Sequence, residues 1–533
     1  MLKNSISYQD TQAFSNTVLD YIANAEKLKP FLGNYPDLAG FKKQIAAKKK
    51  QNLSSSHREV LVTTLKKQYN DINTTTLVKS NIELLLSQNT FTITTGHQLN
   101  LFSGPLYFLY KIISAINLSK QLKEAFPNTN FVPIYWMASE DHDFEEIQYF
   151  NSKNHQIKWE KKAQGAVGKL STEGLDKAFN EFKKILGTTD FDNELLALFK
   201  ASYLEHKTLA KATLYLANAL FKDYGLVIFD ADNKALKEIF SPYIKNEIVH
   251  QTCFNAVSKT INTLEKNYKI QVNPREINLF YLQDNLRERI IYKNEQYYIN
   301  NTNLVFSQAE ILDELANHPE YFSPNVLMRP LYQEVILPNL CYIGGGGELA
   351  YWLELKTYFE ANKVVFPIYL LRNTALIITK KQSRQLEKLG ITKQELFLNK
   401  DTLINKKVKE YSSNCIDFNQ LQATLSKQFD SLEKAINSTD KSFAGAVSAE
   451  KTRQLNSLKK LEKRYYKAEK KRLKTTVSKA EELKDVLFPN GSLQERNQNF
   501  SIFYSLIGKK LIKLLAENLE PLQLDFSILT LKE

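Results

Sequence analysis

The chain has 533 residues, of which 43% are hydrophobic and 11% aromatic, so it can bury a sizeable core and a disordered chain is excluded. Its 71 Lys and Arg against 58 Asp and Glu leave a net charge of +13, which favours a partner or substrate that carries negative charge. No apolar run is long enough to span a bilayer and the N-terminus lacks an apolar signal core, so we expect a soluble, cytoplasmic protein.

The middle of the chain alternates short apolar runs with helical stretches, which is typical of an α/β protein. Residues 91–96 predict a strand that ends at Gly96, a helix follows from Pro105, and residues 131–138 predict a second buried strand. Apolar runs at 225–230 and 364–372 predict further strands. The pattern favours an open parallel sheet with helices on both faces.

Further segments surround this predicted core. The first 85 residues show helical spacing, residues 151–200 are polar and helix-prone, and residues 253–340 mix strand-like pieces with turns. The expected organisation in chain order is an N-terminal helical segment (1–85), core (86–150), a first insertion (151–200), core (201–252), a second, α+β insertion (253–340), core (341–412), a coiled-coil arm (413–487) and a C-terminal segment packed on the core (488–533).

The predicted arm has apolar residues mostly three and four positions apart. They run from Leu421 to Ile436 and again from Leu455 to Leu483, on either side of a turn at 437–440, which predicts a coiled-coil hairpin or dimer arm. The step from Ala468 to Leu473 breaks the heptad. Such an arm has little core of its own, so we expect it to pack against a second copy of the chain.

The first candidate site follows the strand at 91–96. Its sequence, TTGHQLNLFSGP (94–105), lies between a strand end and a helix start, where backbone N–H groups favour an anion. The candidate substrate-binding residues are Gly96, His97, Gln98, Asn100 and Gly104. An ordinary βα turn with a structural histidine explains the segment equally well, and no Walker motif or GxGxxG is present.

The second candidate site is ASEDHDFEE (138–146), directly after the strand at 131–138. Glu140, Asp141, His142 and Asp143 are consecutive ionisable residues at a strand's carboxyl end, where open α/β sheets bind ligands. They could bind an amine, hold Mg²⁺ or act as a general base. The alternative is a solvated acidic loop.

The third candidate site is GGGGELAYWLELK (344–356). Four glycines precede a helix that carries Glu348 and Tyr351, and their conformational cost suggests that a nucleotide or amino acid approaches the backbone closely. A flexible turn is the alternative. Arg329 could clamp a carboxylate or equally form a surface ion pair, and Arg372 and Asn373, after the last apolar strand, are further candidate substrate-binding residues. A second nucleotide pocket, or simple packing, is considered for Gln494, Arg496, Asn499 and Tyr504.

Three segments together resemble one family. TGHQLNLFSGPLYFLYK, PIYWMASEDHDFEEI and SPNVLMRPLYQEVILPNLCYIGGGGELAYW are similar to the BshC family of bacillithiol-biosynthesis enzymes, the cysteine ligases of that pathway, over nearly the full length. Family members often have TGQQ and GPGE where this chain has TGHQ and GGGGE, which leaves the roles of His97 and Gly346 open.

The resemblance implies a fold and a reaction. The fold would be a Rossmann-like core akin to class I aminoacyl-tRNA synthetases, with two connecting insertions and a coiled-coil arm that makes a homodimer. The reaction would add L-cysteine to glucosaminyl-malate in the last step of bacillithiol synthesis. The HxGH and KMSKS signatures of those synthetases are absent, so adenylate chemistry is inferred from fold alone.

The expected mechanism assigns roles to the candidate residues. ATP, with Mg²⁺, would activate the cysteine carboxylate for attack by the amine. Asp141 or Asp143 would accept the amine proton with His142 assisting, and Glu140 would bind an ammonium or a sugar hydroxyl. Arg329 or Arg372 would pair with the malate carboxylates.

Zinc is not expected. The three cysteines, Cys253, Cys341 and Cys415, form no CxxC pair, and none is near His142 in sequence.

Two other functions remain open at this point. The basic stretch at 459–474, with Tyr465 and Tyr466, could bind nucleic acid as part of the arm, or it could be the solvated face of a helix. Another ATP-dependent amide-forming enzyme of the same fold is the third possibility. The enzyme hypotheses require the clusters at 96–105, 140–143 and 344–348 to converge at one rim of one sheet.

Overall fold

The computed structural model describes residues 2–51, 53–412, 416–436 and 441–531. The chain divides into two compact units. The core unit holds Met1–Gln9, Ala13–Ile377 and Gln494–Glu533, and the arm unit holds Asp10–Gln12 and Ile378–Leu493. Residues 378–412, which were expected in the core, belong to the arm unit.

The core unit is built on a five-stranded sheet in the order β13-β12-β2-β3-β6, and all its neighbouring strands are parallel. The strands are β2 (Thr90–His97), β3 (Asn130–Met137), β6 (Val227–Asp230), β12 (Asn339–Gly344) and β13 (Ile368–Leu371). The chain builds outward from β2 through β3 to β6, then returns to the other side of β2 for β12 and β13. The order therefore reverses between β2 and β12, and a crevice for ligands forms at such a switch point.

Four of these strands confirm the sequence predictions at 91–96, 131–138, 225–230 and 364–372. Strand β12 was not predicted, because its short apolar run leads straight into the glycine-rich motif. Helix α6 (Tyr107–Ala125) packs on β2, β3 and β12, with its apolar side chains buried. Helix α3 (Leu38–Gln51) packs on β12 and β13.

The N-terminal segment is helical, as predicted, but it begins with a strand. Strand β1 (Leu2–Ile6) pairs antiparallel with β15 (Phe526–Thr530), and β15 neighbours β14 (Thr374–Ile378). The helices that follow are α1 (Tyr8–Thr11), α2 (Asn16–Ile22), α3, α4 (Ser55–Gln68) and α5 (Thr76–Leu84). The strand pairing joins the two ends of the chain and could not be read from local sequence.

Both insertions carry structure of their own. The first contains the hairpin β4 (Tyr149–Ser152) and β5 (His155–Lys158), then α8 (Leu175–Ile185) and α9 (Asp190–Phe199). The second has an antiparallel sheet in the order β10-β9-β8-β7-β11, which confirms an α+β unit. Its elements are α12 (Thr252–Leu264), β7 (Leu279–Gln283), β8 (Leu286–Lys293), β9 (Gln296–Ile299), β10 (Val305–Phe306), α13 (Gln308–Asn317) and β11 (Phe322–Pro324).

The remaining helices of the core unit complete it. They are α7 (Phe144–Ile147), α10 (Leu209–Phe221), α11 (Lys234–His250), α14 (Arg329–Ile336), α15 (Gly346–Trp352), α16 (Lys356–Ala361), α22 (Gln494–Asn497), α23 (Ser501–Ile507) and α24 (Lys510–Asn518). No helix in the described ranges is long and apolar enough to cross a membrane.

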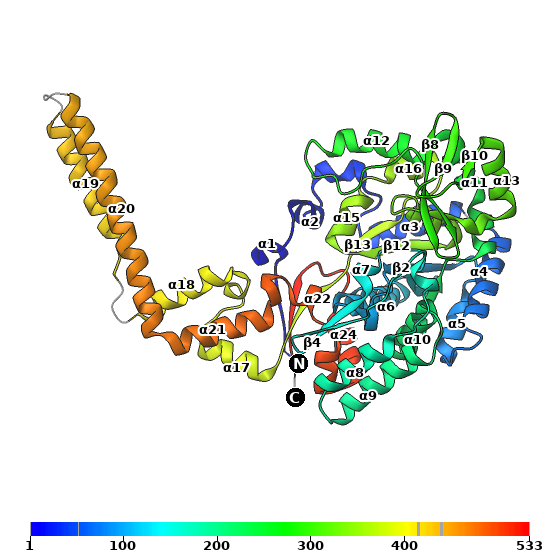
Figure 1. Ribbon diagram of the computed structural model, residues 1–533, viewed down its shortest axis with the longest axis horizontal. Coiled ribbons are helices and arrows are strands. Elements are labelled where there is room, and N and C mark those ends of the chain that lie inside the picture. The colour runs from blue at the N-terminus through cyan, green and yellow to red at the C-terminus, as the bar shows by residue number, and fades with distance from the viewer. Residues whose placement is uncertain (1, 52, 413–415, 437–440, 532–533) are drawn as a thin grey trace. The chain divides into compact units, whose positions relative to one another are not determined.

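The arm unit contains the predicted helical hairpin. Helices α19 (Phe418–Ala435) and α20 (Lys441–Arg472) run alongside each other (Figure 1), and the predicted turn at 437–440 lies outside the described residues, as does Cys415. Helix α20 ends where the heptad breaks, and α21 (Lys474–Leu487) begins after Leu473. Helices α17 (Lys380–Lys388) and α18 (Lys400–Tyr411) complete the unit.

Candidate active site

A cavity of about 860 Å³ opens at the carboxyl ends of the parallel strands. It is lined by residues that follow β2 (Gly96 to Gln98), β3 (Ala138 to Asp141) and β12 (Gly345 to Glu348). The three sequence clusters therefore meet in one cavity, as expected, and the cavity lies at the switch point of the sheet. The role of each residue in this cavity stays a prediction.

The loop after β2 contributes only part of its predicted set. Gly96, His97 and Gln98 line the cavity. Asn100 and Gly104 lie behind it: the Asn100 amide donates to the carbonyl of Glu146 at 3.2 Å, and Gly104 has a φ of 61° with no room for a Cβ beside Asn100. These two residues shape the loop from behind.

His97 is buried and neutral. Burial lowers the pKa of His97 well below its ordinary value, and the positive charges of Lys111 and Arg372 lower it further. Its Nε2 atom is buried and has no hydrogen-bond partner among the described residues. A neutral imidazole with one free nitrogen can exchange a hydrogen bond with a ligand in the cavity.

The acidic segment after β3 splits into residues inside and outside the cavity. Glu140 and Asp141 line it, together with Glu146. Glu140 forms an ion pair with the fully buried Lys237. Asp143 instead accepts from the backbone N–H of Glu146 and caps α7, so its predicted catalytic role finds no support in its position.

The side chain of Gln98 draws two carboxylates together. Its Nε2 donates to Asp141 Oδ2 at 2.9 Å and to Glu146 Oε2 at 2.8 Å. Asp141 Oδ1 also accepts from the backbone N–H of His142 at 2.7 Å. This corner of the cavity therefore concentrates negative charge.

His142 is half exposed at the rim. Arg287 Nη1 lies 2.5 Å from its Nδ1, and because an arginine can only donate, Nδ1 must be the unprotonated nitrogen. Burial lowers the pKa of His142, and the Arg287 charge adds to that effect. The contact fixes the ring as a neutral tautomer with its proton on Nε2.

The glycine-rich turn after β12 is held by Glu348. One Glu348 oxygen accepts from Tyr342 Oη at 2.6 Å, and the other accepts from the N–H of Gly345 at 2.9 Å and pairs with Lys111 Nζ at 2.6 Å. Burial acts to raise the pKa of Glu348, but the Lys111 charge and these hydrogen bonds outweigh it and hold the pKa below its ordinary value. Glu348 is thus an anionic anchor of the turn.

The two predicted arginines, Arg329 and Arg372, differ in whether a carboxylate of the chain already pairs with them. Arg329 stacks over the rings of Trp136 and Tyr342, and its Nη2 is buried without a hydrogen-bond partner in the described chain. Arg372 lines the cavity but pairs with the buried Glu495 at 2.7 Å. Asn373 lies behind the wall, bonded to Ser114 and to the carbonyl of Glu520.

The four residues considered for a second nucleotide pocket have separate environments. Arg496 lines the main cavity, and Tyr351 of the third cluster does so too. Gln494 bonds both backbone groups of Ile377, Asn499 donates to the carbonyls of Phe102 and Gly104, and Tyr504 donates to Glu194. A second nucleotide pocket stays a prediction.

Several cavity residues were missed by the sequence reasoning. Lys111 donates to the carbonyl of Gly96 at 2.6 Å as well as pairing with Glu348, and its burial lowers its pKa. A lone lysine inside the apolar run LYFLYKIISAI was an available signal. Arg287 and Glu146 had no such signal, because Arg287 comes from the second insertion and meets the core only in three dimensions.

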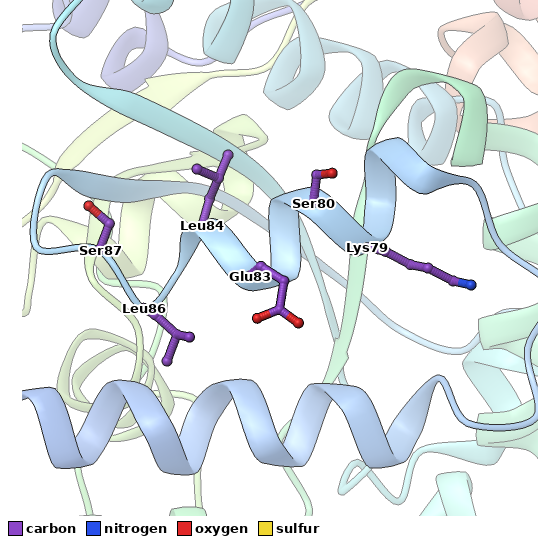
Figure 2. Close-up of a pocket in the computed structure, with 6 residues that line it drawn as sticks. All are labelled: Lys79, Ser80, Glu83, Leu84, Leu86 and Ser87. Carbon is purple, nitrogen blue, oxygen red and sulfur yellow. The ribbon is translucent and has the colours of Figure 1, made fainter.

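Other hollows exist on the core unit. One of them has a volume of about 720 Å³. Figure 2 shows the side chains that line it, which come from α5 and the turn after it (Lys79, Ser80, Glu83, Leu84, Leu86 and Ser87). These residues directly precede β2 in the chain, and none of them lines the cavity of about 860 Å³. It gathers no constellation of charged groups, and we do not assign it a function.

Models of one family match almost the whole chain. Residues 1–373 match "Bacillithiol biosynthesis BshC, N-terminal Rossmann-like domain", and residues 375–531 match "Bacillithiol biosynthesis BshC, C-terminal coiled-coil domain". The chain belongs to the BshC family. The predicted Rossmann-like core and coiled-coil arm are therefore confirmed by family membership as well as by the sheet.

Relatives in several bacteria carry the name "Putative cysteine ligase BshC". The Flavobacterium johnsoniae protein is 52% identical over 531 residues and covers 100% of both chains. The Cytophaga hutchinsonii protein is 39% identical, covering 97% of this chain and 96% of its own. The Staphylococcus carnosus protein is 28% identical, covering 85% and 87%.

Solved structures match as well. One of them is titled as a "putative arginyl t-RNA synthetase" from Campylobacter jejuni, with 11% identity, 84% of this chain and 98% of that chain covered, and a TM-score of 0.22. A score this low supports no statement about the present fold.

Proposed function

We propose that this chain is a carbon–nitrogen ligase that joins the carboxyl group of L-cysteine to the amine of glucosaminyl-malate, as the last step of bacillithiol biosynthesis. Family membership supports the pathway, and the name of the relatives supports the reaction class. The observation that carries the proposal is the charge pattern of the cavity at the switch point. One side of the cavity carries arginines that form no ion pair within the described residues, and the other side carries two neighbouring carboxylates.

The cationic side suits an anionic substrate. Arg287, Arg329 and Arg496 line the cavity, and none of them forms an ion pair within the described residues. Buried cations are normally paired, so a carboxylate or phosphate from the substrate is the expected partner of the free Nη2 of Arg329. The two carboxylates of a malate group meet this requirement.

The acidic side suits an amine. Asp141 and Glu146 both accept from Gln98, and a substrate ammonium with three donors could share the same oxygens. Glu140, held by Lys237, lies in the same wall and could accept from a sugar hydroxyl. The new bond forms at nitrogen, so a group that orients the substrate amine is needed in the cavity.

Carboxylate activation by ATP is part of the proposal. When bound, ATP with Mg²⁺ supplies a leaving group on the cysteine carboxylate. No three His, Cys, Asp or Glu side chains in the described chain gather as a metal site. Mg²⁺ is commonly held by phosphates together with one or two carboxylates, so the phosphates of the nucleotide would supply much of its coordination. Arg496 and Arg372 both line this cavity and could contact the phosphates.

Pairing of two copies through the arm also belongs to the proposal. Leu421, Leu432, Phe443 and Leu461 of α19 and α20 are each between 44% and 54% exposed in the single chain. Large apolar side chains at such exposure on a helical hairpin favour a second copy as cover. We therefore expect a homodimer, which sedimentation would detect.

The reaction is tested with purified protein, L-cysteine, glucosaminyl-malate and ATP-Mg²⁺. We expect bacillithiol and AMP to form together, as measured by mass spectrometry. Asp141→Asn combined with His142→Ala should lose the activity, and Glu173→Gln, an exposed carboxyl outside the cavity, is the matched control. No product with any nucleotide, or full activity in the double variant, would contradict the proposal.

A further inference from the structure

A second, smaller cavity shares a wall with the main one. Its volume is about 260 Å³, and it is lined by residues at the carboxyl ends of β3 and β6 and by residues of α10. Met137 and Ser139 line both cavities, and the backbone register pairs Met137 with Asp230. Asp230 and Asp232 face the small cavity, which is roomy enough for water.

Three of the four carboxylates that line the main cavity are poorly suited to accept a proton. Asp141 has both oxygens engaged by N–H donors, and Glu348 is held by Lys111, Tyr342 and Gly345. Burial raises the pKa of Glu140, but its carboxylate faces the buried Lys237, and protonation would break that ion pair. Donors of this kind favour the charged form, which makes a weak base.

Asp230 has the opposite environment. Its Oδ1 accepts from Ser139 Oγ and from the N–H of Asp232, while no hydrogen bond to Oδ2 occurs in the described chain. Burial, with Asp232 adding negative charge nearby, raises the pKa of Asp230 to about 7. A general base works best with a pKa near the working pH.

The position of Ser139 is fixed by its backbone. The N–H of Gly168 donates to the carbonyl of Ser139 at 2.8 Å, and a Cβ at Gly168 would lie 2.6 Å from the Cβ of Ser139. The serine is therefore clamped between the two cavities, with its hydroxyl on Asp230. A single hydroxyl separates this carboxyl from the main cavity.

We propose that Ser139 and Asp230 form a proton relay that takes the proton from the substrate amine. This rests on the proposed function. As the amine nitrogen bonds to the activated carbonyl carbon and AMP leaves with the electron pair of the broken C–O bond, one N–H proton passes to Ser139 Oγ. The Ser139 proton passes at the same time to Asp230. Asp230 then releases it to water in the small cavity.

Other charged groups face Asp230 and set its titration. Asp232, from the same loop, and Glu140, after β3, both act to raise its pKa. Lys169 lies 3.6 Å from Asp232, and Lys211 of α10 lines the same cavity. Burial is the largest cause of the raised pKa of Asp230, and among the neighbouring charges Asp232 adds more to it than Glu140, which is paired with Lys237.

The test separates the two half-reactions. Activation of cysteine is followed by trapping with hydroxylamine, which needs no deprotonation of the substrate amine. Amide formation is followed from pH 5.5 to 9 with glucosaminyl-malate. In the unaltered protein the amide-forming rate should rise with pH through a midpoint near 7, because Asp230 must be deprotonated to act.

Two variants should abolish this rise of the amide-forming rate with pH. Asp230→Asn and Ser139→Ala are each expected to lower amide formation about 100-fold and to leave hydroxylamine trapping within about twofold. The double variant should be no slower than either single one, because the two groups act as a unit. Thermal unfolding of each variant confirms that it is folded.

Asp232→Asn is the matched control. It removes a carboxyl that lines the same cavity but does not contact Ser139. The variant should keep the rate and move the midpoint to lower pH, because the neighbouring negative charge that raises the pKa of Asp230 is gone.

The outcomes distinguish the relay from the reaction. If Asp230→Asn and Ser139→Ala both keep the amide-forming rate and its rise with pH, the relay is overturned while the proposed function stands. Additive losses in the double variant would overturn it too. No amide from the unaltered protein at any pH would overturn the proposed function, and the relay with it.

Discussion

The cavity of the core unit and the helical hairpin of the arm unit handle charge differently. Around the cavity, ion pairs are buried: Lys111 with Glu348, Lys237 with Glu140, and Arg372 with Glu495, where the cationic side chains are 5%, 0% and 8% exposed. In the hairpin, the pairs of Lys451 with Asp430 and of Arg472 with Glu469 are partly exposed, and one side chain of each pair is close to half exposed. Buried pairs add little stability for their cost, so their concentration around one cavity indicates function there.

The largest expected effect comes from breaking one buried pair. Lys111→Met leaves Glu348 as a buried, uncompensated charge and frees the glycine-rich turn, so stability should fall by about 3 kcal/mol and ligase activity should be lost. Lys451→Met, in the hairpin, should leave both unchanged. Denaturant unfolding measures the stability of both variants and the ligase assay measures their activity. Equal losses in Lys111→Met and Lys451→Met would contradict the difference between the cavity and the hairpin.

Asp230 should make the stability of the core unit depend on pH. Because its pKa is about 7 in the folded chain and 3.8 ordinarily, the stability linked to it is full below pH 3.8 and is lost as pH rises to 7. Asp230→Asn should therefore stabilise the protein at pH 8 by about 2 kcal/mol, half the full value of such a shift, and change little at pH 4. Stabilisation equal at both pH values would contradict the raised pKa.

Arg329 tests the cationic side of the cavity. Arg329→Gln removes the free Nη2, and kcat/KM for glucosaminyl-malate should fall about 30-fold, the scale of one hydrogen bond to a charged group. The KM for cysteine should change little if this residue contacts only the malate group. An unchanged KM for glucosaminyl-malate would show that the malate group does not bind at Arg329.

The smallest effect is expected in the arm. Lys459→Gln, Lys460→Gln and Lys463→Gln together remove three exposed charges of the basic stretch, and ligase activity should change less than about twofold. The same variant tests nucleic-acid binding, because a gel shift at low salt that vanishes with it would establish the arm as a binding surface. A tenfold loss of ligase activity would place the arm in the reaction.

The sequence predicted the architecture well where the signals were local. Strands β2, β3, β6 and β13, the strand pieces of the second insertion and the break at Leu473 all follow from hydrophobic spacing within short windows. Strand β12 was missed because it runs directly into the glycine-rich motif, and the pairing of β1 with β15 was missed because it joins residues more than 500 positions apart.

The site was predicted at the level of segments more than of side chains. Position at strand ends was enough to bring Gly96, Glu140 and Glu348 to one cavity. It could not show that Asp143 turns away to cap a helix or that Asn373 lies behind the wall. Lys111, Arg287 and Asp230 escaped notice because their importance lies in the charges they meet across the fold.

The central claim is that the cavity at the switch point holds the anionic substrate. A crystal structure of the protein soaked with glucosaminyl-malate tests it most directly. The account predicts the malate carboxylates against Arg329, within reach of Arg287 or Arg496, with the amine toward Asp141. Glucosaminyl-malate bound at the opposite edge of the sheet or on the arm, with this cavity empty, would contradict it.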